Sequence, residues 1–157
     1  MKRKRPSDVL VPGPGEGKRG ESGYLGYLLR QAAGAYRHRM DRALADLDVT
    51  PPQFAVMTML NAYPGISNAD VARLALLTPQ TVSVIIANLE RAGTIRKVPH
   101  DVHGRILQIE LTAAGMSLLR RCRKRVHDLE RELIIGLNET THAAIRRWLV
   151  DVAKGST

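Results

Sequence analysis

The stretch ADVARLALLTPQTVSVIIANLERAGTIRKV, residues 69–98, decides the fold of this 157-residue chain. Its first part predicts a helix of about ten residues capped by Ser67 or Asn68, because short polar side chains accept hydrogen bonds from the free N–H groups of a helix start. Asp70 falls in the first turn, where the helix dipole favours an anion. The residues expected to face inward are Val71, Leu74 and Leu77.

Directly after this helix, Thr78 and Pro79 predict the start of a second one, because threonine caps a helix and proline fits its first turn. Its apolar residues recur at helical spacing, and we expect the helix to stop at Gly93. Its buried stripe is expected to consist of Val82, Ile85, Ile86 and Leu89. Two helices joined by a very tight turn are therefore predicted.

A β-hairpin is predicted next. Residues 94–98 and 106–111 are rich in β-branched and aliphatic side chains, and they flank the polar segment PHDVHG at 99–104. Such a pattern indicates two strands around an exposed tip.

The rest of the chain is predicted to be helical. Residues 24–47 have apolar side chains every three or four positions, which is typical of a long amphipathic helix. A short helix is expected to follow the cap at Thr50, and two further helices are expected to start at Thr112 and Asn138. The predicted fold class is mainly α with a small β-hairpin wing.

A helix, a tight turn, a second capped helix and a basic hairpin follow one another in the order of a winged helix-turn-helix. The major groove of B-DNA is about 12 Å wide and admits one α-helix, whose N-terminal residues reach the base edges. The expected DNA-binding residues on the second helix are Thr78, Pro79, Gln80, Thr81, Ser83, Val84 and Asn88. On the hairpin they are Arg96, Lys97, His103 and Arg105.

These side chains suit the chemistry of DNA in different ways. Gln80 can form a bidentate pair with adenine, and Val84 can contact a thymine methyl group. Thr81 and Ser83 can reach a phosphate or a base. An arginine on a projecting wing suits the narrow minor groove of A·T-rich DNA. The alternative is a solvated polar helix face beside a hairpin that binds nothing.

The net charge of +9 favours a polyanionic partner such as double-stranded DNA, although an anionic membrane or an acidic protein would satisfy the same charge. Residues 1–22 combine glycine, proline and charged residues, which predicts a disordered basic arm. That arm either contacts phosphate or serves only to solubilise the chain.

Several classes of protein are excluded by this sequence. It has no uninterrupted apolar run of about 18 residues, the minimum for a membrane span, and no signal peptide, and its lone Cys122 agrees with a cytoplasmic location. Because it has no glycine-rich phosphate loop, nucleophile elbow or paired carboxylates, we expect neither an enzyme nor a cofactor. No metal site is expected at His100, Asp101 and His103, since a fourth ligand is missing.

Three segments carry a resemblance to a known family. They are LDVTPPQFAVMTML at 47–60, the opening stretch at 69–98, and HGRILQIELTAAG at 103–115. Their order and spacing resemble the MarR family of bacterial and archaeal transcription regulators, over about residues 24–154. The resemblance implies a homodimer with a winged helix-turn-helix in each subunit, dimerised through the first, fifth and sixth helices.

This resemblance also implies a domain organisation and residue roles. The implied domains are a disordered basic arm at 1–22, a dimerisation helix at 23–50, a DNA-binding domain at 51–112 and C-terminal dimerisation helices at 113–157. The recognition helix is expected at 78–91, and Arg105 matches the arginine of the family's Asp-x-Arg wing motif. Two positions depart from the family, since His103 replaces that aspartate and Val84 replaces a frequent arginine.

An apolar stripe near the C-terminus is interpreted as part of the dimer interface. It consists of Leu118, Cys122, Val126, Leu129, Leu133 and Leu137. A two-fold dimer would present two reading helices roughly 34–36 Å apart, which matches successive major grooves on one side of a palindromic site. The alternative is ordinary packing within the chain.

A small effector is also implied by the resemblance. Arg30, in YLLRQAA, falls where several relatives have an arginine that binds the carboxylate of a ligand. Phe54 and Thr58 are expected to face the same cleft. The expected effector is an aromatic carboxylate or its coenzyme A thioester. The alternative is a surface arginine and a core phenylalanine.

The sequence as a whole is therefore predicted to encode a ligand-responsive transcriptional regulator, in most cases a repressor, that binds a palindromic operator as a dimer. One alternative is an architectural DNA-binding protein of weak specificity. Another is a module that binds a protein through the hairpin and the preceding helix.

Overall fold

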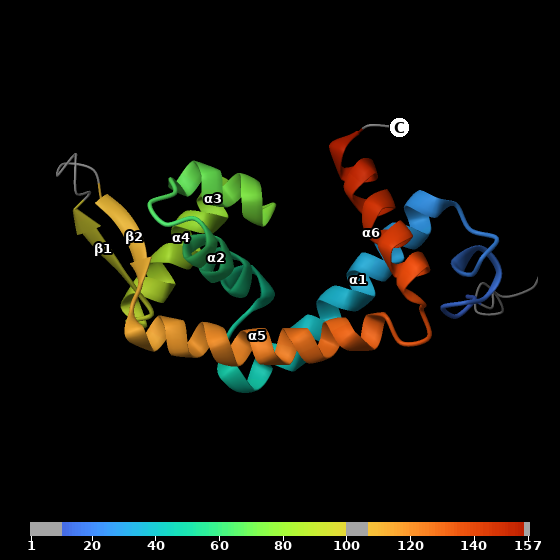
Figure 1. The fold of residues 1–157 in the computed structure, drawn as a ribbon, viewed down its shortest axis with the longest axis horizontal. Coiled ribbons are helices and arrows are strands. Elements are labelled where there is room, and N and C mark those ends of the chain that lie inside the picture. The colour runs from blue at the N-terminus through green and yellow to red at the C-terminus, as the bar shows by residue number, and fades with distance from the viewer. Residues whose placement is uncertain (1–10, 100–106, 156–157) are drawn as a thin grey trace, which may run out of the picture. The chain divides into compact units, whose positions relative to one another are not determined.

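The computed structural model describes residues 11–99 and 107–155 (Figure 1). The elements are η2 (Gly17–Arg19), α1 (Leu25–Leu44), η3 (Ala45–Leu47), α2 (Pro51–Ala62), α3 (Asn68–Ala75), α4 (Pro79–Arg91), β1 (Ile95–Pro99), β2 (Leu107–Leu111), α5 (Ala113–Leu133) and α6 (Glu139–Lys154). The predicted class, mainly α with a small hairpin, is confirmed. The chain divides into two compact units, Met1–Arg39 and Met40–Thr157.

Helix starts in this chain are set by side-chain caps. Thr50, Thr78, Thr112 and Asn138 each accept a hydrogen bond from the backbone N–H three residues later, and each precedes a helix. At Thr50 the side chain of Gln53 also accepts from the Thr50 N–H, at 2.9 Å, which completes a capping box. These bonds are local, and so the predicted helix starts agree with the observed ones.

Within the first unit, residues 12–23 fold into a short turn against α1. The Arg19 guanidinium donates to Gln31 Oε1 at 3.1 Å, and Gln31 Nε2 donates to the Arg19 carbonyl at 3.1 Å. The whole arm, 1–22, was expected to be disordered, but hydrogen bonds to α1 order its described part, 11–22. Residues 1–10 lie outside the described residues.

The core of the second unit is formed by α2, α3, α4, the hairpin and the first half of α5. Its buried side chains include Leu44, Val56, Met57, Leu60, Val71, Val82, Ile86, Leu89, Leu119 and Cys122. The strands pair antiparallel, with Ile95 opposite Leu111 and Pro99 opposite Leu107. In Figure 1, α2, α3 and α4 lie beside the hairpin and above the first half of α5.

The hairpin is joined to both neighbouring helices at Thr94, which is 8% exposed. Its hydroxyl donates to the Leu89 carbonyl at 2.7 Å, and its own carbonyl accepts from the Thr112 N–H at 3.0 Å. The Thr112 hydroxyl donates to the Gly93 carbonyl at 2.7 Å. The end of α4, both strands and the start of α5 are thus held by one set of hydrogen bonds.

Two expectations about burial were wrong. Leu74 was expected to face inward from α3, but it is 45% exposed, and Ala72 is buried instead because it lies on the side that packs against the core. The stripe on α5 was interpreted as a dimer interface, but Cys122 and Leu129 are already buried in the single chain.

The other residues of that stripe behave in two ways. Leu118 and Val126 pack against the core of their own chain, whereas Leu133 and Leu137 are exposed. Intramolecular packing therefore accounts for most of the stripe, since the winged domain covers the first half of α5.

Among the described residues, no single helix is long and apolar enough to cross a membrane. Helices α3 and α4 reach a sufficient length and apolar content only when they are taken together, and they are bent by 107° relative to each other.

Gly115 is required where α5 meets the hairpin. A Cβ atom at this position would lie 1.9 Å from the Thr94 carbonyl oxygen. We expect Gly115→Ala to lower the free energy of unfolding by about 3 kcal/mol, because the backbone must shift to relieve the overlap. Gly34→Ala in α1 is the control, since nothing lies within 4 Å of its added Cβ, and it should stabilise by about 0.5–1 kcal/mol. Equal effects of the two changes in urea unfolding would contradict this account.

Leu76 stores strain in the turn between α3 and α4. It has φ 55°, in the left-handed region, and its side chain is 90% exposed, so its burial contributes little. We expect Leu76→Gly to raise the free energy of unfolding by about 0.5–1 kcal/mol. Asp48→Gly, at φ 52°, should gain less because aspartate tolerates this conformation. Thermal unfolding of both variants measures the difference, and a destabilised Leu76→Gly protein would refute the proposed strain.

Candidate nucleic-acid interface

The pair α3 and α4 forms a helix-turn-helix. The two helices are bent by 107° relative to each other, within the range of about 90–120° found for this motif. Ser67 caps α3, and its hydroxyl also donates to the Asp70 carboxylate at 2.6 Å. The turn is closed by the Leu77 N–H, which donates to the Ala72 carbonyl at 2.9 Å.

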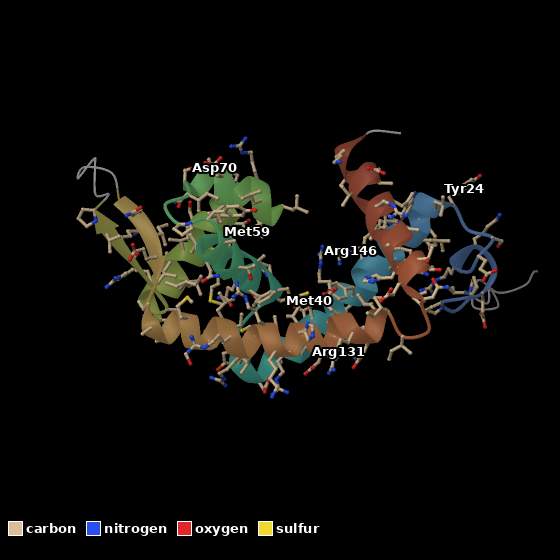
Figure 2. All side chains as sticks on the ribbon, in the orientation of Figure 1. Tyr24, Met40, Met59, Asp70, Arg131 and Arg146 are labelled. Atoms are coloured by element: carbon tan, nitrogen blue, oxygen red, sulfur yellow. The ribbon has the colours of Figure 1, made fainter. Side chains whose placement is uncertain are left out.

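Asp70 is fixed at the start of α3 (Figure 2). The hydrogen bond from Ser67 and the ion pair with Arg73 hold the pKa of the Asp70 carboxyl below its usual value. Asp70 therefore stays ionised at neutral pH, where it complements the positive end of the helix dipole.

Helix α4 has one buried and one exposed face. Val82, Ile85, Ile86 and Leu89 are buried as predicted. All seven residues expected to contact DNA from this helix are exposed, namely Thr78, Pro79, Gln80, Thr81, Ser83, Val84 and Asn88. Val84 is 61% exposed, although it is apolar. The arrangement leaves a mostly polar helix face open to a large partner.

Several of these side chains are oriented by bonds within α4. The hydroxyls of Thr78 and Thr81 lie 2.8 Å apart, and Ser83 donates to the Pro79 carbonyl at 2.9 Å. Asn88 Oδ1 accepts from the Arg91 guanidinium at 3.1 Å. Such bonds hold the side chains in defined positions and reduce the entropy that is lost when a ligand binds.

The basic residues of strand β1 are paired with carboxylates. Arg96 lies 3.2 Å from Glu110 on the opposite strand, and Lys97 lies 2.7 Å from Glu90 at the end of α4. Exposed pairs of this kind contribute only about 0–1 kcal/mol, so both cations can exchange their carboxylate for a phosphate at little cost. The remaining expected wing residues, His103 and Arg105, lie outside the described residues.

Sequence reasoning missed the two carboxylates that pair with the wing. The hairpin register places Arg96 directly opposite Glu110, so this pair follows once the register is known. The Lys97–Glu90 pair joins a strand to a helix, and only the tertiary structure brings these residues together.

The residues expected to bind a small ligand are placed in different parts of the chain. Phe54 is half-buried and lines a hollow with residues of α5. Thr58 lies one turn further along the same face of α2, and its hydroxyl is buried with no hydrogen-bond partner among the described residues. Arg30 belongs to the first unit, where its guanidinium lies 5.8 Å from the centre of the Tyr27 ring.

Cys122 is fully buried in the core of the second unit. Burial raises the pKa of its thiol, which therefore stays protonated at neutral pH. The cysteine acts as a small apolar residue. Over residues 11–99 and 107–155, no group of three or more histidine, cysteine, aspartate and glutamate side chains is arranged to hold a metal ion.

Comparison with known proteins agrees with this geometry. A family model described as the MarR family matches residues 47–106. The HTH-type transcriptional repressor Rv2887 of Mycobacterium tuberculosis is 33% identical over 125 residues, which are 80% of this chain and 90% of the relative. This chain belongs to the MarR family. MarR-family proteins and the matched relatives are transcriptional regulators rather than enzymes.

Two solved structures of MarR-type proteins share the fold. Rv2887 in complex with p-aminosalicylic acid has a TM-score of 0.69 and 30% identity, and covers 83% of this chain and 99% of its own. A transcriptional repressor named CouR, bound to a 23-mer DNA duplex, has a TM-score of 0.77 and covers 88% of this chain and 98% of its own. At 24% identity, the likeness to CouR concerns the fold alone.

Proposed function

We propose that this MarR-family protein is a dimeric transcriptional repressor that binds a palindromic DNA site and is released by a small anionic aromatic ligand. The observation that carries the proposal is the exposed, mostly polar face of α4, supported by a buried apolar stripe within a helix-turn-helix. Helices of this motif enter the major groove with their N-terminal residues. The relative Rv2887 is named a transcriptional repressor, which supports the same function here.

Each DNA-binding residue has a proposed role. The side-chain amide of Gln80 forms no hydrogen bond among the described residues, so it is available for a bidentate pair with adenine. Val84 contacts a thymine methyl group, while Thr78, Thr81, Ser83 and Asn88 bind bases or phosphates beside Pro79. On the wing, Arg105 enters the minor groove and Arg96, Lys97 and His103 contact the backbone.

The proposed dimer interface uses the apolar face of α6. Ile145, Trp148, Leu149 and Val152 recur at helical spacing and are between 37% and 42% exposed. Such a continuous apolar face is unfavourable in water unless another surface covers it, and a second copy of the chain satisfies this need symmetrically. We retain the proposed organisation of a basic arm (1–22), a dimerisation helix (23–50), a DNA-binding domain (51–112) and C-terminal dimerisation helices (113–157).

The proposed effector is an anionic aromatic molecule. Arg30, Phe54 and Thr58 are its candidate contacts, and the buried, unpaired hydroxyl of Thr58 supports a ligand that offers it a hydrogen bond. Structures of Rv2887 with salicylic acid and with p-aminosalicylic acid support this class of ligand. Binding would favour a state whose reading helices no longer match the groove spacing.

We expect Gln80→Ala to weaken binding to the operator by about 1–3 kcal/mol and to relax the preference for one base pair, because one bidentate contact is lost. Arg105→Ala should weaken binding by a similar amount without unfolding the protein. Affinity is measured by fluorescence anisotropy on a DNA fragment selected from random sequences, at several salt concentrations. The control for Arg105→Ala is Arg131→Ala, which also removes one positive charge but does so on α5, where Arg131 pairs with Asp128.

Unchanged affinity in both variants would remove α4 and the wing from the proposed interface. A uniform coating of any duplex, abolished by salt and by competitor DNA, would instead indicate an architectural protein.

We expect Leu149→Asp to shift the protein from dimer to monomer, because it places an unpaired charge in the proposed interface. Val150→Asp is the matched control, since Val150 is 51% exposed but lies on a different side of α6. Analytical ultracentrifugation measures the mass of each variant. A Leu149→Asp protein that stays dimeric, or equal dissociation of both variants, would refute this interface.

A further inference from the structure

The first half of α5 carries a dense group of cations on its solvent-facing side. The segment RRCRKR, residues 120–125, has five arginines and lysines within two turns of the helix. The opposite side of α5, which includes Leu119 and Cys122, is buried in the core of the second unit. We call the exposed residues of the solvent-facing side the α5 outer surface, namely Ala113, Ser117, Arg120, Arg121 and Lys124.

The cations of this surface are not neutralised by the carboxylates around them. Two nearby carboxylates are already in ion pairs, which are Asp46–Arg125 at 2.6 Å and Asp128–Arg131 at 2.8 Å. Glu130 and Glu132 also take part in other interactions. The α5 side chains of this surface that form no ion pair or hydrogen bond in the described part of the chain are those of Arg120, Arg121 and Lys124.

The side chains that accompany these cations are small. Ala113, Ser117 and Arg121 follow one another at steps of four residues, so two short side chains extend the basic surface toward the start of α5. Before Leu133, α5 has no exposed large apolar side chain among the described residues. A large, smooth polyanion can therefore approach the cations without a steric obstacle.

The absence of exposed apolar anchors on this part of α5 argues against two other partners. A helix that binds a membrane surface inserts an apolar face beside its cations. A protein partner gains most of its affinity from a few aromatic or aliphatic side chains packed into pockets. Contacts to a phosphate backbone need only cations and polar groups, which this surface supplies.

The α5 outer surface is separate from the reading face of α4. Helices α4 and α5 both turn their buried sides toward the same core, and α2 and the hairpin pack against each of them. Their exposed faces therefore point away from each other. A duplex held in its groove by α4 leaves the cations of α5 open to another molecule.

We propose that the α5 outer surface binds the phosphate backbone of a second DNA duplex while α4 holds the operator. The contact is independent of sequence, because arginine and lysine recognise phosphates and reach no base edge. This inference goes beyond the proposed function, since it gives the regulator the ability to bridge two DNA segments.

Fluorescence anisotropy on the full chain tests the second contact directly. The protein is first saturated with unlabelled operator, selected from random sequences, and a fluorescent duplex of unrelated sequence is then added. The wild-type complex should take up the second duplex. The logarithm of the binding constant should fall with the logarithm of the salt concentration with a slope of about −2.7, as expected for three phosphate contacts.

Two double variants separate the surface from a general effect of charge. Arg120→Ala with Lys124→Ala should weaken uptake at least about tenfold at ~50 mM salt and make the slope shallower by about 1.8. The matched control is Arg147→Ala with Lys154→Ala, which removes the same charge from exposed positions of α6 on the side opposite its apolar face. The control should keep the wild-type uptake and slope.

Several results would overturn the proposal. They are a wild-type complex that takes up no second duplex, an equal loss of uptake in both double variants, and a loss of operator affinity in the α5 double variant that the control does not share. Binding of phosphatidylserine vesicles through Arg120 and Lys124, without uptake of duplex DNA, would assign the surface to a membrane and would also refute it.

The same variants keep this inference distinct from the proposed function. If no sequence-specific operator is found, the proposed function fails, and the two double variants compared on unrelated duplex alone still test the α5 outer surface. If the operator is bound and released as proposed but no second duplex is taken up, only the bridging contact is refuted.

Discussion

The hydrogen bonds around Thr94 are the constraint on which the reading head depends. One buried threonine ties the last turn of α4 to β1, and its carbonyl ties β1 to the start of α5. Gly115 allows α5 to approach that carbonyl closely. Because the wing and the recognition helix are anchored at the same point, they keep a constant spacing as a rigid group. A protein that contacts two grooves at once needs such a spacing.

The net charge of +9 does not show which cations of this protein are paired with carboxylates. The cations of β1, which face the proposed DNA, are already paired with carboxylates of α4 and β2. These pairs orient the cations and weaken non-specific attraction to other polyanions. On α5, Arg125 and Arg131 are paired, but Arg120, Arg121, Arg123 and Lys124 have no such partner among the described residues. Among the described residues, both cations of β1 are therefore paired, whereas only some of the cations of α5 are.

Apolar surface also has two roles along α5 and α6. The first half of α5 is covered by the winged domain of the same chain, which explains the burial of Cys122. Helix α6 has no buried residue, and its apolar face remains half-exposed. The contrast explains why one stripe of leucines contributes to the stability of the monomer while the next apolar face is available to a second subunit.

The sequence by itself determined the elements and their order. Caps at Thr78, Thr112 and Asn138 and the helical spacing of apolar residues are local properties, and local hydrogen bonds satisfy them whatever surrounds the chain. The exposed residues of α4 followed from the same periodicity, because its buried stripe leaves one face outward. The tertiary structure alone decided which apolar side chains are covered, as at Leu74 and Leu129, and which charges meet, as at Lys97 and Glu90. It also created the hollow at Phe54, because burial and pairing between segments far apart in the chain depend on how the elements pack, which periodicity does not specify.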